Sequence, residues 1–346
     1  SFCSMASRPP QSALFLERDP RHARRLSTGC ARIDACLGGG FDAHGLTEIA
    51  GAAGTGKTQL VLQCMLQAQL PPAVGGLGGG AVFLHADTPS YLAPMKRLEE
   101  LSHSFAAKHA ALGATSGLLM SFVHVMQLHS ADALWQTLKD TEWLRTKQVR
   151  LVVIDSVAGL FRTSDEEGGS RAAAAYERSR QLLRLAARLR QLSDAFDVAV
   201  LVVNQVTDKP LDTPAAASVS AAEAEACLSG GGDSLRVPAL GLSWRSSPLR
   251  QHAPPSRSTD HELTHSSLRS SSVNTRLLLT RHERPAAAEA PPLPPYATHP
   301  GAAPVAEEGG GGGLTFAREM HVLFSPRLPH SSCRFEVRAE GVVGVG

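Results

Sequence analysis

The chain has 346 residues, enough for one large or two small domains. Its hydrophobic content of 43 % can build a sizeable core and excludes a wholly disordered protein. The formal net charge of +2 excludes a polycation, so nucleic-acid binding would need local clusters of Lys and Arg. Six scattered cysteines without a Cys-x-x-Cys pair, and no apolar run near the length of a membrane span, predict a soluble protein in a reducing compartment.

The N-terminal segment 1–25 is short, rich in Arg and punctuated by Pro, and we expect a flexible basic arm. Short apolar runs follow at 46–50, 81–86, 151–154 and 198–203, as is typical of parallel strands buried on both faces. Between the last two runs, apolar residues recur every three to four positions, which predicts a long helix; these are Leu182, Ala186, Leu189, Leu192 (or the neighbouring Ser193) and Phe196. Helices that alternate with buried strands predict an α/β fold with a mainly parallel sheet.

The C-terminal part is interrupted twice. Segment 245–272 is rich in Ser and His, and segment 285–313 is rich in Pro and ends in a glycine tract. Neither has enough apolar surface to offset the entropy of ordering, so both are predicted to be disordered insertions. Alternating patterns at 274–280, 321–325 and 334–338 predict further strands. We therefore expect a single domain over 26–346.

Segment 51–58 reads Gly-Ala-Ala-Gly-Thr-Gly-Lys-Thr and matches the phosphate-loop pattern G-x-x-x-x-G-K-[ST]. Glycines let such a loop curl with its N–H groups around a phosphate, while Lys57 adds a positive charge and the Thr58 hydroxyl can bind Mg²⁺. A predicted strand precedes the loop and a helical pattern at 59–69 follows it, which favours this interpretation over a glycine-rich turn. The predicted triphosphate-binding residues are Gly51, Ala52, Ala53, Gly54, Thr55, Gly56, Lys57 and Thr58.

Polar residues follow three of the other predicted strands. Asp155 comes after 151–154 and is predicted to hold the Mg²⁺ water shell, although an Asp at this place can simply end a strand. Asp87 follows 81–86 and is a candidate general base that acts with Lys57 in catalysis; its alternative is a turn former. Asn204-Gln205 follows 198–203, where an amide could sense a γ-phosphate.

Longer stretches carry a family resemblance. Segment 27–40 reads Ser-Thr-Gly-Cys-Ala-Arg-Ile-Asp-Ala-Cys-Leu-Gly-Gly-Gly and is followed by Thr47-Glu48 and by Gly56-Lys57-Thr58-Gln59. The pattern continues with Asp155-Ser156, Phe161-Arg162 and the runs 201–206 and 237–244. On these residues the chain resembles the RecA/RadA recombinases, and among them a eukaryotic recombinase paralogue, over about 26–244, 273–282 and 318–344.

The resemblance implies a RecA-like P-loop NTPase core that binds ATP and Mg²⁺. It also implies homologous-recombination repair of DNA double-strand breaks and crosslinks, in a nuclear complex with another recombinase paralogue. By the same resemblance Gln59 joins the nucleotide site and Gln205 couples the γ-phosphate to the loop that follows it. Arg97 falls where the family stacks an arginine on adenine, with a surface arginine as the alternative.

Two departures from the family's pattern bear on activity. The recombinases have Glu at the position of Asp87, and the shorter side chain retracts the carboxylate, so slow hydrolysis is expected. Filament-forming members carry Asp before Ser-Pro, whereas Phe324 precedes Ser325-Pro326 in this chain. This difference counts against the nucleotide contact between neighbouring subunits of a filament.

In the family, the loops after Asp155-Ser156 and after Gln205 face the filament axis, and the basic residues in or beside them are the DNA-binding candidates: Arg162, Arg171, Lys209 and Arg236. The second loop, 207–237, has more acidic than basic residues and no aromatic residue. Because binding to single-stranded DNA normally combines a basic groove with aromatic stacking, we expect weak binding of single-stranded or branched DNA by the chain alone. The Arg-rich stretch 178–190 is more basic, with a solvated helix face as its alternative.

Three functional hypotheses remain open. The first is an enzyme, a DNA-dependent ATPase that acts in strand exchange. The second is an interaction protein whose ATP site regulates assembly with a partner paralogue. The third is a different RecA-like motor, such as a circadian-clock-type ATPase or a replicative helicase.

Overall fold

The computed structural model describes residues 23–86, 92–161, 171–210, 234–238, 273–283 and 316–345. Most of the predicted arm, residues 1–22, lies outside these ranges. Both predicted insertions, 245–272 and 285–313, also lie outside them, so their order stays a prediction.

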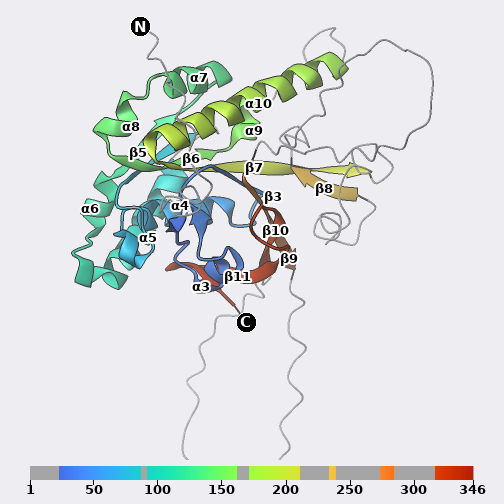
Figure 1. The fold of residues 1–346 in the computed structure, drawn as a ribbon. Coiled ribbons are helices and arrows are strands. Elements are labelled where there is room, and N and C mark those ends of the chain that lie inside the picture. Colours follow the sequence, from blue (N-terminus) through green and yellow to red (C-terminus); the bar gives the residue numbers. More distant parts are fainter. Residues whose placement is uncertain are drawn as a thin grey trace, which may run out of the picture.

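The described strands form one large twisted sheet and a small ribbon (Figure 1). Six strands run parallel in the order β9-β3-β7-β6-β4-β5, and the antiparallel strands β10, β11 and β12 extend the sheet beyond β9, while β8 pairs with β7. The strands are β1 (Arg25–Leu26), β2 (Phe41–Asp42), β3 (Leu46–Gly51), β4 (Gly80–His85), β5 (Val123–Gln127), β6 (Val149–Asp155), β7 (Ala199–Pro210), β8 (Ser234–Pro238), β9 (Thr275–Glu283), β10 (Phe316–Phe324), β11 (Ser332–Arg338) and β12 (Gly341–Gly344).

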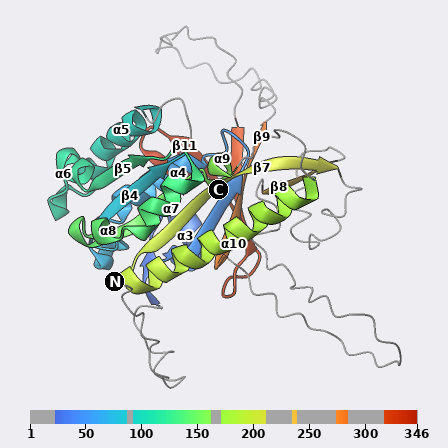
Figure 2. The ribbon, with the colours of Figure 1, turned by 90° about the horizontal axis from the view of Figure 1, so that it is seen from above.

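Helices cover both faces of the sheet (Figures 1 and 2). One face is covered by α3 (Ala31–Cys36), α4 (Lys57–Gln67), α5 (Leu92–Lys108) and α6 (Ser116–Ser121). The opposite face is covered by α7 (Ala131–Lys139), α8 (Glu142–Thr146), α9 (Val157–Leu160) and α10 (Arg171–Phe196). Short 3₁₀ turns occur at Pro72–Val74 and Ala110–Leu112. The predicted α/β class with a mainly parallel sheet is confirmed.

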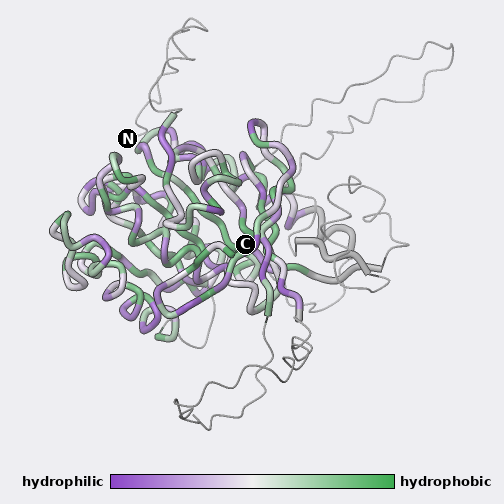
Figure 3. Tube along the Cα trace, turned by 90° about the horizontal axis from the view of Figure 1, so that it is seen from below, coloured by the Kyte–Doolittle hydropathy of each residue, from purple (hydrophilic) through white to green (hydrophobic). Residues whose placement is uncertain are grey.

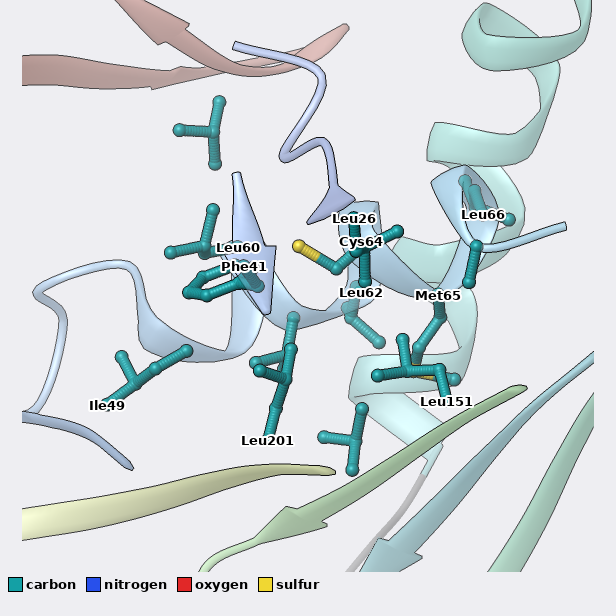
Figure 4. Packing of buried hydrophobic residues seen from close by; sticks show 14 of the residues in the cluster. Leu26, Phe41, Ile49, Leu60, Leu62, Cys64, Met65, Leu66, Leu151 and Leu201 are labelled. Atoms are coloured by element: carbon teal, nitrogen blue, oxygen red, sulfur yellow. The ribbon is translucent and has the colours of Figure 1, made fainter. Parts of the chain in front are cut away.

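Strand periodicity divides the core into two layers. Successive side chains point to opposite faces of a strand, so Ile49 packs in the layer of α4 while Leu46 packs in the layer of α10. Figure 4 shows the first layer, in which Leu60 and Leu62 of α4 gather with Leu201 of β7. The hydropathy colouring of Figure 3 places the hydrophobic segments along these central elements. Both faces of the central strands are buried, which explains why they appear in the sequence as continuous apolar runs.

The predicted long helix is confirmed as α10. Leu182, Ala186 and Leu189 are buried, and both of the alternatives at the next turn, Leu192 and Ser193, are buried too. The Ser193 hydroxyl donates to the Val198 carbonyl at 2.7 Å and accepts from the Gly45 N–H at 2.7 Å. Ser193 can therefore lie on the buried face of α10, because its hydroxyl both donates and accepts a hydrogen bond.

Some boundaries differ from the sequence predictions. Helix α4 begins at Lys57, two residues before the predicted start. Strand β7 continues beyond the predicted end at 203 to Pro210, because β8 pairs with its last five residues. The predicted loop 207–237 therefore has strands at both of its ends, and 211–233 lies outside the described residues. Strand β5 was not predicted, because it is an edge strand whose Val125 and Met126 are exposed and leave no continuous apolar run.

The last residues assigned to the flexible arm belong to the folded part, which corrects the predicted boundary. Arg24 donates to the Asp197 carboxylate at 2.6 Å, and Arg25 pairs with Asp42 at 3.0 Å across the β1-β2 ribbon. Each arginine has a carboxylate partner supplied from a distant part of the chain, which local composition does not reveal. Among the described helices, none is long and apolar enough to span a membrane.

Candidate functional site

The candidate site lies where the parallel strands end. Gly51 closes β3 and is flanked in register by Gln205 of β7 and by Leu279 of β9. Asp155 closes β6 next to β7. The carboxyl ends of parallel strands in an open α/β sheet are the usual place for a ligand site. Three of the sequence candidates, Gly51, Asp155 and Gln205, are thus brought to one edge.

The loop after β3 has a conformation that requires glycine. Gly54 and Gly56 have φ values of +74° and +99°, in the left-handed region that other residues rarely adopt. Space is limited as well, since a Cβ on Gly56 would lie 3.2 Å from the Phe335 ring and one on Gly54 would lie 2.5 Å from the Arg281 guanidinium. Gly56 is also the N-cap of α4, whose N-terminal N–H groups then point into the loop.

Lys57, Thr58 and Asp155 meet at the start of α4. The Thr58 hydroxyl donates to Asp155 Oδ2 at 2.7 Å, and the Lys57 ammonium donates to the Ala52 carbonyl at 2.8 Å. Lys57 is 8 % exposed, and this burial lowers the pKa of its ammonium while the Asp155 carboxylate opposes the shift. A buried cation whose one described carboxylate neighbour is Asp155 is well suited to bind a further anion.

A pocket of about 460 Å³ opens beside the loop. Among the residues that the structure describes, its lining contains four basic side chains and no carboxylate, and consists of Gly54, Gly56, Lys57, Thr58, Gln59, Arg97, Arg318, Val337, Arg338 and Ala339. Arg97 donates to Gln59 Oε1 at 2.8 Å and to the Arg338 carbonyl at 2.6 Å, which holds α5 against the end of β11. The pocket is therefore a cationic cleft of the kind that binds polyanions.

Sequence reasoning missed two of these arginines. Arg318 on β10 donates to the Gly54 carbonyl at 3.4 Å, and Arg338 closes β11. Arg318 and Gly54 are 264 residues apart in the sequence. Only the pairing of β10 and β11 beyond β9 brings these side chains to the loop, so no local pattern could have identified them.

The remaining candidates differ in how far the structure describes them. Asp87 and Arg162 lie outside the described residues, although β4 carries the chain to the same edge, where the Ala86 N–H donates to the Asp155 carbonyl at 2.9 Å. Arg171 begins α10. Lys209 and Arg236 occupy the paired strands β7 and β8. The proposed DNA-binding roles of these four basic residues stay predictions.

The donors at this edge fit a nucleoside triphosphate with Mg²⁺. Loop N–H groups at a helix N-terminus, a buried Lys and a basic cleft suit phosphates. The Thr58 hydroxyl and the Asp155 carboxylate are oxygen donors of the type that Mg²⁺ prefers, and they already lie within hydrogen-bond distance of each other.

Comparison with known proteins places this geometry in a family. The sequence model of the Rad51 family matches residues 21–232, which include the phosphate loop, Asp155 and Gln205. The chain belongs to the Rad51 family. The resemblance to RecA/RadA recombinases and the RecA-like fold predicted from it are therefore confirmed.

Curated relatives extend the similarity over almost the whole chain. The chain is 30 % identical over 339 residues to the DNA repair protein XRCC3 homolog of Arabidopsis thaliana, with 96 % of each chain covered. It is 34 % identical to DNA repair protein XRCC3 of Bos taurus, covering 94 % of this chain and 76 % of the relative. The Mus musculus protein of the same name is 32 % identical, with 96 % and 79 % covered. These relatives support assignment of the chain as a recombinase paralogue in DNA repair.

Proposed function

We propose that this Rad51-family chain is a recombinase paralogue that binds ATP with Mg²⁺ and acts in homologous-recombination repair of double-strand breaks and crosslinks. The observation that carries the proposal is the 2.7 Å contact between Thr58 and Asp155, beside buried Lys57 in a basic cleft. When bound, Mg²⁺ would neutralise phosphate charge and orient the triphosphate. Thr58 and Asp155 would hold the ion directly or through water.

Each part of the chain has a distinct task in this proposal. The N–H groups of loop 51–58 and the Lys57 ammonium bind phosphate oxygens. Arg97 lines the cleft with its guanidinium held by Gln59, in a position suited to contact the base. Gln205, one strand away from Gly51, connects the phosphate end of the site to the segment that continues β7.

Asp87 is proposed to orient or deprotonate the attacking water. Its short side chain reaches less far than Glu, so hydrolysis is expected to be slow. The ATP site would then act mainly as a switch for assembly with another recombinase paralogue in the nucleus. Weak binding of single-stranded or branched DNA by the chain alone belongs to the same proposal.

Measurement of ATP affinity tests the proposed nucleotide and Mg²⁺ site. A fluorescent ATP analogue should bind the wild-type chain more tightly with Mg²⁺ than with EDTA. The K57A variant should lose at least about tenfold in affinity, because a charge-assisted contact to phosphate is worth about 1.5 to 3 kcal/mol. D155N should lose the Mg²⁺ enhancement while it retains Mg²⁺-independent binding. Lys147, which follows α8 away from the site, supplies the matched K147A control. Equal affinities for wild type, K57A and D155N would overturn the proposed site.

Turnover and assembly separate the functional hypotheses. ATP hydrolysis should be slow with or without single-stranded DNA, and D87E should accelerate it if Asp87 is the base. Strong stimulation by DNA would favour the strand-exchange ATPase.

Co-purification with candidate recombinase paralogues should depend on ATP and weaken in K57A. Retention of the partner regardless of ATP would remove the regulatory role. Family membership together with near-full-length similarity to DNA repair proteins disfavours a circadian-clock-type ATPase or a replicative helicase.

A further inference from the structure

Two cysteines from opposite ends of the sequence line one surface pocket, whose described lining includes no residue of the phosphate loop. Cys36 is the last residue of α3, and Cys333 is the second residue of β11. Both are free thiols, half-buried against the hydrophobic layer that contains α4. Neither was assigned a function by the sequence patterns or by the candidate site.

The two thiols share one surface pocket. Cys36 Sγ lies 3.1 Å from the hydroxyl of Ser331, two residues before Cys333 in the chain, and both cysteines pack on the hydrophobic layer that contains α4. Both cysteines line one open pocket of about 490 Å³, together with Arg32 and Arg334. A small polar oxidant can therefore reach both sulfur atoms. The other described cysteines, Cys30 and Cys64, are 4 % and 0 % exposed and do not line this pocket.

We propose that Cys36 and Cys333 are a redox modification site that forms a reversible disulfide on reaction with a hydroperoxide. In the first step the Cys36 thiolate attacks the peroxide oxygen, the O–O bond breaks, and a sulfenic acid and hydroxide form. In the second step the Cys333 sulfur attacks the Cys36 sulfur, the S–O bond breaks, and water leaves as the S–S bond forms. Two thiols and one hydrogen peroxide are thereby converted to one disulfide and two waters.

The environment assigns a different role to each sulfur. The side-chain interaction with Cys333, opposed by burial, lowers the pKa of the Cys36 thiol to about 6. The same interaction raises the pKa of Cys333 well above its usual range. Together with the 3.1 Å contact between Cys36 Sγ and the Ser331 hydroxyl, these directions assign the attacking thiolate to Cys36. Conversion of Cys36 to sulfenic acid removes the negative charge that held the proton on Cys333, which frees Cys333 to resolve the intermediate.

The bond would join α3 to β11. Because both thiols line one pocket, a disulfide of about 2.05 Å between them would link two elements that already lie side by side. Among the residues that the structure describes, no group of three His, Cys, Asp or Glu side chains is placed to hold a metal ion. This arrangement favours oxidation of the pair over binding of a metal by it.

The test is oxidation of the full chain in a C3S/C227S background, which leaves four cysteines. Stoichiometric hydrogen peroxide should lower the intact mass by 2 Da, and non-reducing peptide mapping should find Cys36 joined to Cys333. Dithiothreitol should restore the mass. The midpoint of thermal unfolding should rise on oxidation, because the cross-link restricts the unfolded chain.

Two single variants make the assignment specific. C333S should stop at the first step, so that dimedone labels Cys36 as a sulfenic acid, whereas C36S should show neither the disulfide nor rapid labelling. C64S is the buried control and should oxidise as the background protein does. No mass loss under peroxide, or a disulfide that involves Cys30 or Cys64, would overturn the proposal. These readouts do not depend on nucleotide binding, so they are separate from the test of the ATP site.

Discussion

At the scale of single residues, Asp197 illustrates how one carboxylate can organise distant segments. It follows α10 with φ of +57°, and it binds Arg24 at 2.6 Å, His44 at 2.5 Å and Arg150 at 3.3 Å. Burial raises the pKa of this carboxyl, but its hydrogen bond and charge interaction with Arg24, together with the charges of His44 and Arg150, leave the pKa below its usual value. Asp197 thus connects Arg24, just before β1, to Arg150 of β6 in the sheet.

This depressed pKa predicts a pH-dependent contribution to stability. Asp197 should stabilise the fold fully above its ordinary pKa of 3.8, and that contribution should disappear as the pH falls through the lower pKa of the folded state. D197N keeps a side chain that tolerates positive φ and removes the charge, so it should cost about 1 to 2 kcal/mol near neutral pH and much less at about pH 2. Urea unfolding at both pH values measures the difference.

Asp194, exposed on α10, offers the control for this experiment. D194N should change stability by less than about 0.5 kcal/mol at either pH. A cost of D197N that is the same in acid and at neutral pH would show that the charge of Asp197 is not what stabilises the fold.

At the scale of elements, Gln63 joins three separate parts of the structure. It lies within α4 and is 6 % exposed. Its amide nitrogen donates to the Thr28 carbonyl at 2.6 Å, and its amide oxygen accepts from the Val342 N–H at 2.7 Å. The helix that carries Lys57 and Thr58 is thereby tied to the segment before α3 and to β12.

Replacement of Gln63 by Leu should be costly although the two side chains are similar in size. The Q63L variant leaves a buried carbonyl and a buried N–H without their partner, so we expect a loss of about 2 to 4 kcal/mol in the free energy of unfolding. Q69L is the matched control, because Gln69 follows α4 and, among the described residues, its side chain donates to one carbonyl, that of Met65 within the helix. Chemical denaturation measures both variants; equal losses would contradict the bridging role.

At the scale of the whole molecule, residues from the last described strands pack in the same hydrophobic layer as residues from the first described elements. Phe335 of β11 is fully buried in the α4 layer, and its ring lies against Gly56 of the phosphate loop. Val342 of β12 is buried in the same layer. The antiparallel strands β10 to β12 therefore support the candidate site as well as the core.

Truncation of Phe335 should lower both the stability of the fold and the affinity for nucleotide. The F335A variant removes a buried ring and should lower the free energy of unfolding by about 3 to 5 kcal/mol. Because it also removes packing against Gly56, affinity for the ATP analogue should fall even where the protein remains folded. F122A is the control, since Phe122 is 39 % exposed and its truncation should cost less than about 1 kcal/mol. Unchanged nucleotide affinity in folded F335A would limit Phe335 to a role in stability.

Parts of the fold and the site follow from local sequence. The apolar runs at 46–50, 81–86 and 151–154 correspond to β3, β4 and β6, because strands buried on both faces need continuous apolar residues. The phosphate loop was predictable because its glycines, Lys57 and Thr58 are adjacent in the chain. Edge strand β5 was not predictable, since its exposed side chains follow no such constraint.

The sequence by itself determined the parallel α/β core, the phosphate loop and the candidate magnesium residues, because each depends on residue types that are close in the chain. Only the tertiary structure decided which distant arginines line the cationic cleft and which two cysteines share a pocket. Arg318 reaches Gly54 across 264 residues, and Cys333 lines the same pocket as Cys36 because β11 returns to lie beside α3. Such contacts result from sheet order and from packing of the shared hydrophobic layer, to which residues distant in the chain contribute jointly.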